Sequence, residues 1–199
     1  MARVIVHATV TLDGFMADEH RGVDWMFDFP SAPEDEAVVQ RVMDEIGAIV
    51  GVANRTQTIE DGEIPYGGML KVPVFLMTRR AHEPVERDGI TYTFVVDDIA
   101  RALESAKEAA GDRWVSLLGG SISRQCLERG LVDELHLDVV PILLGGGISL
   151  FAGLGTRIDL ERLETSAYAS EAHLRYRVLR ESGSGQKVVT PAAASAEPT

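Results

Sequence analysis

Short apolar runs of strand length constrain this chain more than any other feature. Ala48–Val50 and Trp114–Leu118 are apolar almost throughout and show no alternation of apolar and polar positions. Runs of this kind are typical of strands that are covered on both faces, as in a parallel sheet. Further strands are expected over residues 4–10, 73–77 and 91–96. The sequence therefore predicts a central, mostly parallel sheet.

Two helical patterns separate these runs. Ser31 and Glu34 predict an N-cap with its capping-box partner, and an apolar helical repeat follows until Gly47. Asp97 predicts the cap of a second helix over residues 98–110. Strand and helix thus alternate along the first part of the chain, which is typical of an α/β fold with helices on both faces of the sheet.

The last part of the chain changes character. Residues 160–168 and 173–179 predict two strands that only a few residues separate, so we expect an antiparallel C-terminal hairpin in an otherwise mostly parallel mixed sheet. No linker or internal repeat interrupts residues 1–181, which predict one domain. Residues 182–199 offer few large apolar side chains, and we expect them to form a disordered tail.

Composition excludes several classes of function. The formal net charge of −12 argues against nucleic-acid and anionic-membrane partners, which require a basic face. The single cysteine, Cys126, excludes an internal disulfide, and the five histidines show no metal-ligand spacing, so no metal site is predicted. The apolar run over residues 2–8 is too short for a membrane span or signal peptide, so we expect a cytoplasmic protein.

The segment Trp114–Ser123 places a strand, two glycines and a helix start in direct succession. Gly119 and Gly120 let the backbone approach a ligand, and the free N–H groups of a helix start at Ser121 attract anions. A pyrophosphate fits this arrangement. A tight strand-to-helix turn, with Ser121 as an ordinary N-cap, explains the same residues, so the segment alone leaves both interpretations open.

A second candidate lies where the strand over residues 73–77 ends in Thr78, Arg79 and Arg80. Ligands bind at the carboxyl ends of strands in open α/β sheets, and a guanidinium group binds phosphate in a bidentate manner. The alternative is a solvated basic strand end.

Two loops complete the candidates. Asp13 follows the first strand, and Asp24 and Trp25 lie in the loop after it, where a carboxylate and aromatic rings suit a flat, apolar ligand. The same aromatics would equally well cover the core. Pro141 and the glycines at 145–147 predict a strand break or bulge rather than a second phosphate loop.

Taken in order, these segments resemble the reductase domain of bacterial riboflavin biosynthesis proteins, within the dihydrofolate reductase-like family. The resemblance covers roughly residues 2–180 and rests on four motifs: Thr11–Phe15, Val72–Arg79, Leu118–Ser121, and Val132–Leu135 followed by Pro141, Gly145 and Phe151. It implies a dihydrofolate reductase-like fold, NADPH as the hydride donor and, frequently, a homodimer.

The resemblance also assigns cofactor residues by position. It places Leu118, Gly119, Gly120, Ser121 and Ile122 on the cofactor phosphates, with a strained peptide, either cis or trans, between the two glycines. Thr78 and Arg79 would hold the 2′-phosphate side, and Ala8, Asp13 and Gly14 would lie near the nicotinamide and substrate. The family's Gly-Arg-x-Thr segment corresponds to Gly51, Arg55 and Thr56, where the Arg and Thr come late. This departure leaves the preference for NADPH over NADH open.

Dihydrofolate reductases use a carboxylate soon after a loop tryptophan to engage the pterin ring. After Trp25 the first such residue is Asp28, with Asp24 as a rival and Glu34 and Asp35 further on. The resemblance thus implies substrate contacts at Asp13, Asp24 and Trp25, and a catalytic carboxylate at Asp28 or Asp13.

Together, residues and resemblance predict an NADPH-dependent oxidoreductase similar to dihydrofolate reductase or 5-amino-6-(5-phosphoribosylamino)uracil reductase. It would transfer a hydride to a small heterocyclic substrate of the pteridine or pyrimidine-ribosyl type. The cofactor carries such chemistry, so few titrating side chains are required. The alternative is a non-catalytic nucleotide-binding dimer, a sensor or scaffold, which the altered segment from Gly51 to Thr56 favours.

Overall fold

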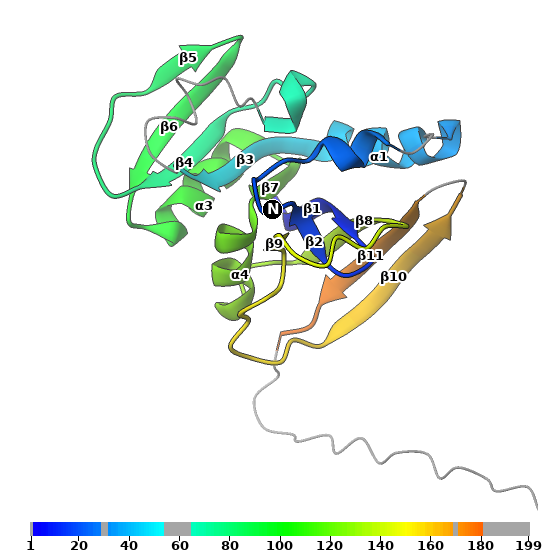
Figure 1. The fold of residues 1–199 in the computed structure, drawn as a ribbon. Helices are drawn as coiled ribbons and strands as arrows, with labels where there is room; N and C mark the ends of the chain where they lie inside the picture. The colour runs from blue at the N-terminus through cyan, green and yellow to red at the C-terminus, as the bar shows by residue number, and fades with distance from the viewer. Residues whose placement is uncertain (1, 29–31, 54–64, 169–170, 181–199) are drawn as a thin grey trace, which may run out of the picture.

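The computed structural model describes residues 2–28, 32–53, 65–168 and 171–180 (Figure 1). Within these ranges a nine-stranded mixed sheet has the order β10-β11-β8-β1-β7-β3-β4-β6-β5, and β2 pairs with β9 in a separate sheet. The strands are β1 (Val4–Thr11), β2 (Phe15–Ala17), β3 (Ile46–Val52), β4 (Val74–Thr78), β5 (Val85–Arg87), β6 (Ile90–Val96), β7 (Trp114–Leu118), β8 (Glu134–Val140), β9 (Ile148–Ser149), β10 (Leu160–Ala167) and β11 (Ala172–Val178). The helices are α1 (Pro33–Glu45), α3 (Ile99–Ala110) and α4 (Gly120–Glu128), with 3₁₀ turns η1 (Asp24–Phe27) and η2 (Pro65–Gly68).

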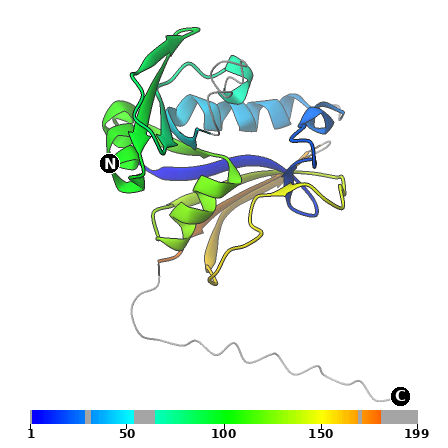
Figure 2. The same ribbon diagram turned by 60° about the vertical axis from the view of Figure 1, so that its left-hand side comes forward.

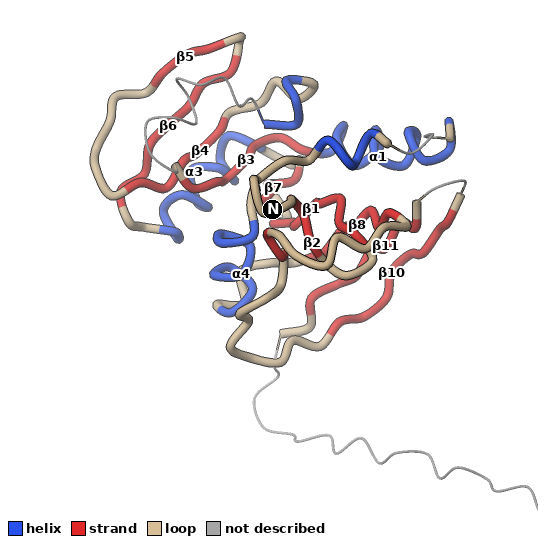
Figure 3. Tube along the Cα trace, in the orientation of Figure 1, coloured by secondary structure: helices blue, strands red, loops and turns tan. Residues whose placement is uncertain are grey.

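The sheet is parallel in its centre and antiparallel at its ends. β8, β1, β7, β3, β4 and β6 run parallel to one another, whereas β10 and β11 form an antiparallel hairpin beside β8. The predicted mostly parallel mixed sheet and its C-terminal hairpin are therefore confirmed. Figure 3 shows the long, mostly irregular segment that leads from β8 to β10, in which β9 is the short strand.

Helices cover both faces of the sheet (Figure 2). α3 buries the apolar stripe Ile99, Ala102, Leu103 and Ala106 against one face, in the larger of two core clusters. α4 packs into the same cluster through Ile122, Cys126 and Leu127. On the other face, a smaller cluster around Ile49 packs against Val42 of α1. The predicted flanking helices are thus confirmed.

The caps of both helices differ from the prediction by one residue. α1 begins at Pro33, and the Ala32 N–H donates to the Asp35 carboxylate at 3.2 Å, so Asp35 takes the place predicted for Glu34. Ser31, predicted as the N-cap, lies outside the described residues. Asp98 rather than Asp97 caps α3, because its carboxylate accepts from the Arg101 N–H at 2.9 Å.

Gly47 does not end α1, as its position suggested. The helix ends at Glu45, and Gly47 lies inside β3. A Cβ atom on Gly47 would stand 2.8 Å from the carbonyl oxygen of Ala110, so the glycine permits close packing of β3 against the end of α3.

Two predictions concern the C-terminal tail and membrane-spanning helices. Residues 182–199, predicted as a tail, lie outside the described residues. Within the described ranges, each helix is too short or too polar to cross a membrane.

Candidate functional site

The carboxyl ends of six parallel strands meet at one edge of the sheet. These strands end at Val140 (β8), Thr11 (β1), Leu118 (β7), Val52 (β3), Thr78 (β4) and Val96 (β6). Open α/β sheets bind ligands at this edge. The structure therefore brings together three of the predicted cofactor positions: Leu118, Thr78 and Gly51, which is the last buried residue of β3.

The β7–α4 junction provides backbone donors at this edge. Gly119 has φ 102° and ψ 146°, a conformation that a residue with a side chain rarely adopts. The peptide bond between Gly119 and Gly120 is trans rather than cis. The Ser123 hydroxyl donates to the Gly119 carbonyl oxygen at 2.9 Å. The first N–H groups of α4 have no partner within the helix, and a Cβ atom on Gly119 would meet nothing within 4 Å. An anion could therefore approach this turn.

Gly120 and Ile122 also have a packing role that the sequence did not indicate. A Cβ atom on Gly120 would stand 2.9 Å from Nη1 of Arg124 and 3.1 Å from the carbonyl oxygen of Ser149, so Gly120 packs α4 against β9. A valine there would disturb this packing before it could block a ligand. The Ile122 side chain is fully buried in the core. Only the backbone of these two residues, and the exposed Ser121, remain available to a ligand.

Thr78 and Arg79 lie two strands away from this junction, on β4. Neighbouring strands are about 4.8 Å apart, which places the two ends on the order of 10 Å from each other. Thr78 Oγ1 accepts from the Arg80 N–H at 3.3 Å. Because β4 ends at Thr78, both Arg79 and Arg80 lie in an exposed bend, and strand alternation does not decide which of them faces the junction. Arg55 and Thr56 lie outside the described residues.

The first loop is held by Asp13. Its carboxylate accepts from the Thr11 hydroxyl at 2.5 Å and from the N–H groups of Gly145 at 2.8 Å and Leu144 at 3.3 Å. The hydrogen bond from Thr11 is the largest cause of a lowered pKa at Asp13. Asp13 thus fastens the β1–β2 turn to the glycine-containing loop after β8. Ala8, on β1, packs against the larger core cluster.

The 3₁₀ turn η1 places Asp24 and Asp28 in solvent and buries Trp25. Trp25 is 7% exposed, and its indole Nε1 has no acceptor among the described residues. A buried donor without an acceptor costs roughly 1–3 kcal/mol, which makes this N–H a candidate donor to a bound ligand. Of the three carboxylates predicted soon after Trp25, Asp28 and Glu34 are exposed, whereas Asp35 on α1 is buried, at 1% exposure.

Asp35 belongs to a buried polar network that joins α1 to the sheet. His173 on β11 lies between two carboxylates: its Nε2 is 3.0 Å from Asp35 Oδ1, and its Nδ1 is 2.7 Å from Asp138 Oδ1. Asp138 on β8 also contacts His7 Nε2 at 3.0 Å through its other oxygen. Burial disfavours ionised Asp138, but the hydrogen bonds from His173 and His7 outweigh it and lower its pKa to about 2. Burial also opposes the charged form of His173, yet the two carboxylates raise its pKa.

The network continues to the centre of the sheet. His7 Nδ1 is 3.3 Å from the Tyr66 hydroxyl, which lies 2.8 Å from the Ser116 hydroxyl. Burial is the main cause that raises the pKa of Tyr66 to about 12. Five hydrogen bonds thus connect Asp35 on α1 with Ser116 on β7 through largely buried side chains.

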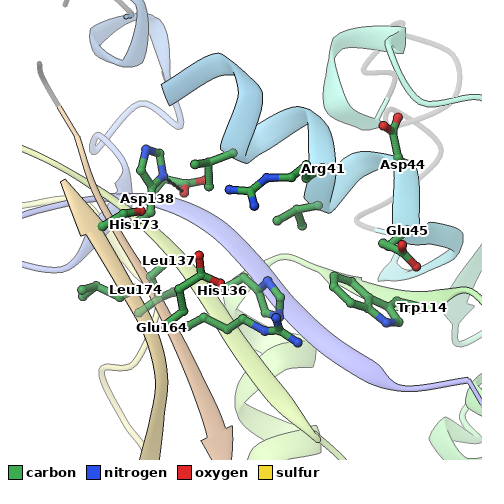
Figure 4. Close-up of a pocket in the computed structure, with 14 residues that line it drawn as sticks. Arg41, Asp44, Glu45, Trp114, His136, Leu137, Asp138, Glu164, His173 and Leu174 are labelled. Carbon is green, nitrogen blue, oxygen red and sulfur yellow. Dashed lines mark hydrogen bonds and ion pairs between the residues drawn. The ribbon is translucent and has the colours of Figure 1, made fainter. Parts of the chain in front are cut away.

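A cavity of about 360 Å³ lies between α1 and this polar face of the sheet (Figure 4). His173 and Asp138 line one end, near the carboxyl ends of the strands. Trp114 and Glu45 line the other end, where β7 begins and α1 ends. Arg41 extends from α1 over the opening.

The cavity floor is charged as well. His136 Nε2 lies 3.0 Å from Glu134 Oε2, and Arg175 donates to the same carboxylate at 2.8 Å. The Arg175 guanidinium also stands 5.6 Å from the centre of the Trp114 ring. Burial lowers the pKa of His136, which favours a neutral imidazole.

Sequence reasoning missed most of this second site. The sequence did offer a signal, because polar residues occupy every second position of two expected strands. They are Glu134, His136 and Asp138 in the strand that became β8, and His173 and Arg175 in the strand that became β11. Polar groups at every second position predict one polar face on each strand. That face was not recognised because the histidines were judged by their spacing along the chain rather than across strands.

Comparison with known proteins agrees with the fold. The chain is 28% identical to the uncharacterized protein YyaP of Bacillus subtilis over 178 residues, which is 84% of this chain and 90% of the relative. A solved Shewanella structure named for riboflavin biosynthesis has a TM-score of 0.73 at 23% identity, covering 90% of this chain and all of that one.

Enterococcus faecalis dihydrofolate reductase, solved with NADP(H), has a TM-score of 0.55 at 12% identity, covering 88% of this chain and 96% of the other. These structural likenesses confirm the dihydrofolate reductase-like fold. The model of the RibD C-terminal domain matches residues 69–174, more than half of the sequence. The chain therefore belongs to the RibD C-terminal domain family.

Proposed function

We propose that this chain is an NADPH-dependent reductase that transfers a hydride to a small heterocyclic substrate of the pteridine or pyrimidine-ribosyl type. The observation that carries the proposal is the turn at Gly119, which presents the N-terminus of α4 at the carboxyl edge of the sheet. Membership in the RibD C-terminal domain family supports it. The Enterococcus neighbour binds NADP(H) on the same fold.

The residues present fit this cofactor. Its pyrophosphate would lie on the N–H groups around Gly119 and Ser121, where the structure leaves open space. Arg79 would hold the 2′-phosphate, about two strand spacings away. The cofactor, when bound, supplies the hydride, and the protein supplies orientation and charge.

The substrate would contact Trp25 and a carboxylate close to it in the sequence. Trp25 Nε1, which has no acceptor in the part of the chain that the structure describes, would donate to an acceptor atom of the ring. Asp35 is a better candidate than the exposed Asp28 or Asp24 for the carboxylate that engages the ring, because burial strengthens its interactions. Asp13 would shape the neighbouring turn through its contacts to Leu144 and Gly145.

One observation favours the non-catalytic alternative. Asp35 and Asp138 are both engaged by His173, so the network offers no free acid or base to a substrate as it stands. A nucleotide-binding sensor or scaffold would bind NADPH without turning it over. The homodimer stays a prediction of the resemblance, and the cytoplasmic location stays a prediction from the short apolar run over residues 2–8.

Titration of both cofactors into the purified chain, Arg79→Ala and Arg80→Ala tests the cofactor assignment. Hydrogen bonds to charged groups contribute roughly 1.5–3 kcal/mol, so losing Arg79 should weaken NADPH binding by about ten- to a hundredfold. NADH binding should hardly change because NADH lacks the 2′-phosphate. Arg80→Ala is the matched control, since both arginines are exposed in one bend. An equal loss for both cofactors, or an effect at Arg80 alone, would contradict the assignment.

Oxidation of NADPH in the presence of pteridine or aminopyrimidine acceptors separates the two functions. Turnover supports the reductase. Tight NADPH binding without turnover with any of these acceptors supports the sensor or scaffold.

A further inference from the structure

The turn into β11 brings three potential metal ligands together on the α1 side of the sheet. One donor atom each from Asp138, Glu171 and His173 lies within 4.8 Å of the other two. The antiparallel register sets Asp138 of β8 opposite His173, and Glu171 directly precedes β11. We propose that Asp138, Glu171 and His173 bind one divalent transition-metal ion of the Zn²⁺ class, which the proposed reductase function does not require.

The donor set suits such an ion. One imidazole and two carboxylates are ligands that Zn²⁺ takes in proteins, at bonds of about 2.0–2.2 Å, and three protein ligands leave a position for water or another oxygen. Bonds of that length hold neighbouring ligand atoms roughly 3–3.5 Å apart. His173 Nδ1 and Asp138 Oδ1 are already 2.7 Å apart, so binding requires loss of the Nδ1 proton and a small outward movement.

The groups behind the ligands support the same assignment. His173 Nε2 contacts Asp35 at 3.0 Å, which leaves Nδ1, 2.7 Å from Asp138 Oδ1, as the nitrogen for the metal ion. Metal-bound histidines almost always donate their second N–H in this way, commonly to a carboxylate. The far oxygen of Asp138 is held by His7 Nε2 at 3.0 Å. Both ligands are therefore oriented from behind.

Charge and access complete the argument. Three carboxylates converge here, from Asp35, Asp138 and Glu171, against the two imidazoles of His7 and His173. A divalent ion would offset the excess negative charge. Asp138 and His173 also line the 360 Å³ cavity, and Glu171 is partly exposed, so an ion can enter without opening the core (Figure 4).

Calorimetric titration of Zn²⁺ into the chelator-treated, dialysed chain tests the site. We expect saturable binding of one ion per chain and a higher melting temperature in the presence of Zn²⁺. Glu171→Gln removes a ligand at the partly exposed side of the site and should weaken Zn²⁺ binding at least tenfold. His173→Gln should abolish it, and Asp35→Asn should weaken it by about ten- to a hundredfold, as loss of a supporting carboxylate does.

His136→Gln is the matched control, because His136 is also a buried histidine of the same sheet face but bonds Glu134 instead. It should leave Zn²⁺ affinity unchanged. Co²⁺ absorption spectra should differ between the wild type and Glu171→Gln, because the spectrum of bound Co²⁺ depends on its protein ligands. The proposal is overturned if no saturable binding occurs, or if folded Glu171→Gln binds Zn²⁺ as tightly as the wild type.

Discussion

Asp35→Asn tests how firmly the buried network holds α1 on the sheet. Asp35 is 1% exposed, and its two oxygens contact His173 Nε2 at 3.0 Å and the Ala32 N–H at 3.2 Å. The first contact is a hydrogen bond between charged groups, worth roughly 1.5–3 kcal/mol, and the second caps a helix, worth about 0.5–2 kcal/mol. Asparagine can keep one acceptor but not the charge. We therefore expect the free energy of unfolding to fall by about 2–4 kcal/mol.

Urea unfolding with a chelator present measures this loss. For a slope of about 2 kcal/mol per molar urea, the midpoint should fall by about 1–2 M. Asp44→Asn is the control on the same helix, because the Asp44 carboxylate makes an exposed hydrogen bond with Gln40 at 2.7 Å. It should change stability by less than about 0.5 kcal/mol. Equal effects of the two substitutions would refute the claim that Asp35 anchors α1.

The stability loss caused by Asp35→Asn should depend on pH in a defined direction. The folded-state pKa of His173 is raised above its ordinary value of 6.5. The contribution of protonated His173 to the free energy of unfolding is therefore complete below the pKa of the unfolded state and is lost as the pH rises through the pKa of the folded state. The penalty of Asp35→Asn should be larger at pH 6 than at pH 9. A penalty that grows with pH would contradict a charged His173 between Asp35 and Asp138.

Two further predictions concern backbone and tail. Gly147→Ala should unfold or severely destabilise the protein, because Gly147 has φ 132° and a Cβ atom there would stand 2.2 Å from the carbonyl oxygen of Ala17. Gly145→Ala, at φ 71° with open space around it, should lower the free energy of unfolding by only about 1 kcal/mol. Thermal melts of the two variants measure the difference. A chain that ends at Glu181 should melt at the same temperature as the full chain, because residues 182–199 offer little to bury. A large drop in melting temperature would show that the tail packs on the body or on a partner.

The parts of the fold that depend on local pattern could be predicted from the sequence. The strand Trp114–Leu118 has the predicted bounds, and the hairpin of β10 and β11 was foreseen from two nearby strand patterns. The Gly119 turn is local in the same sense. The packing of its neighbour Gly120 was not foreseen because the partner, Ser149 on β9, comes from a distant segment.

The buried network could not be predicted in the same way. Asp35 and His173 are 138 residues apart, and Asp138 and His173 are 35 residues apart. Their contact depends on the register of β11 against β8 and on where α1 crosses the sheet. A one-residue change of register would turn His173 to the opposite face. The separation of the histidines along the chain does not give that register, so an expectation based on it overlooked the site.

The central position of β1 has a consequence for how the protein is made. β1 is the first strand in the sequence, yet both of its neighbours, β7 and β8, come from residues 114–140. At roughly 5–20 residues per second, the ribosome needs on the order of 5–25 s to deliver them after β1 has formed. During that interval Val4, Val6 and Val10, all buried in the finished fold, have no strand to pair with. The nascent chain should therefore depend on chaperones that shield its N-terminal segment, and slower translation before residue 114 should increase its aggregation.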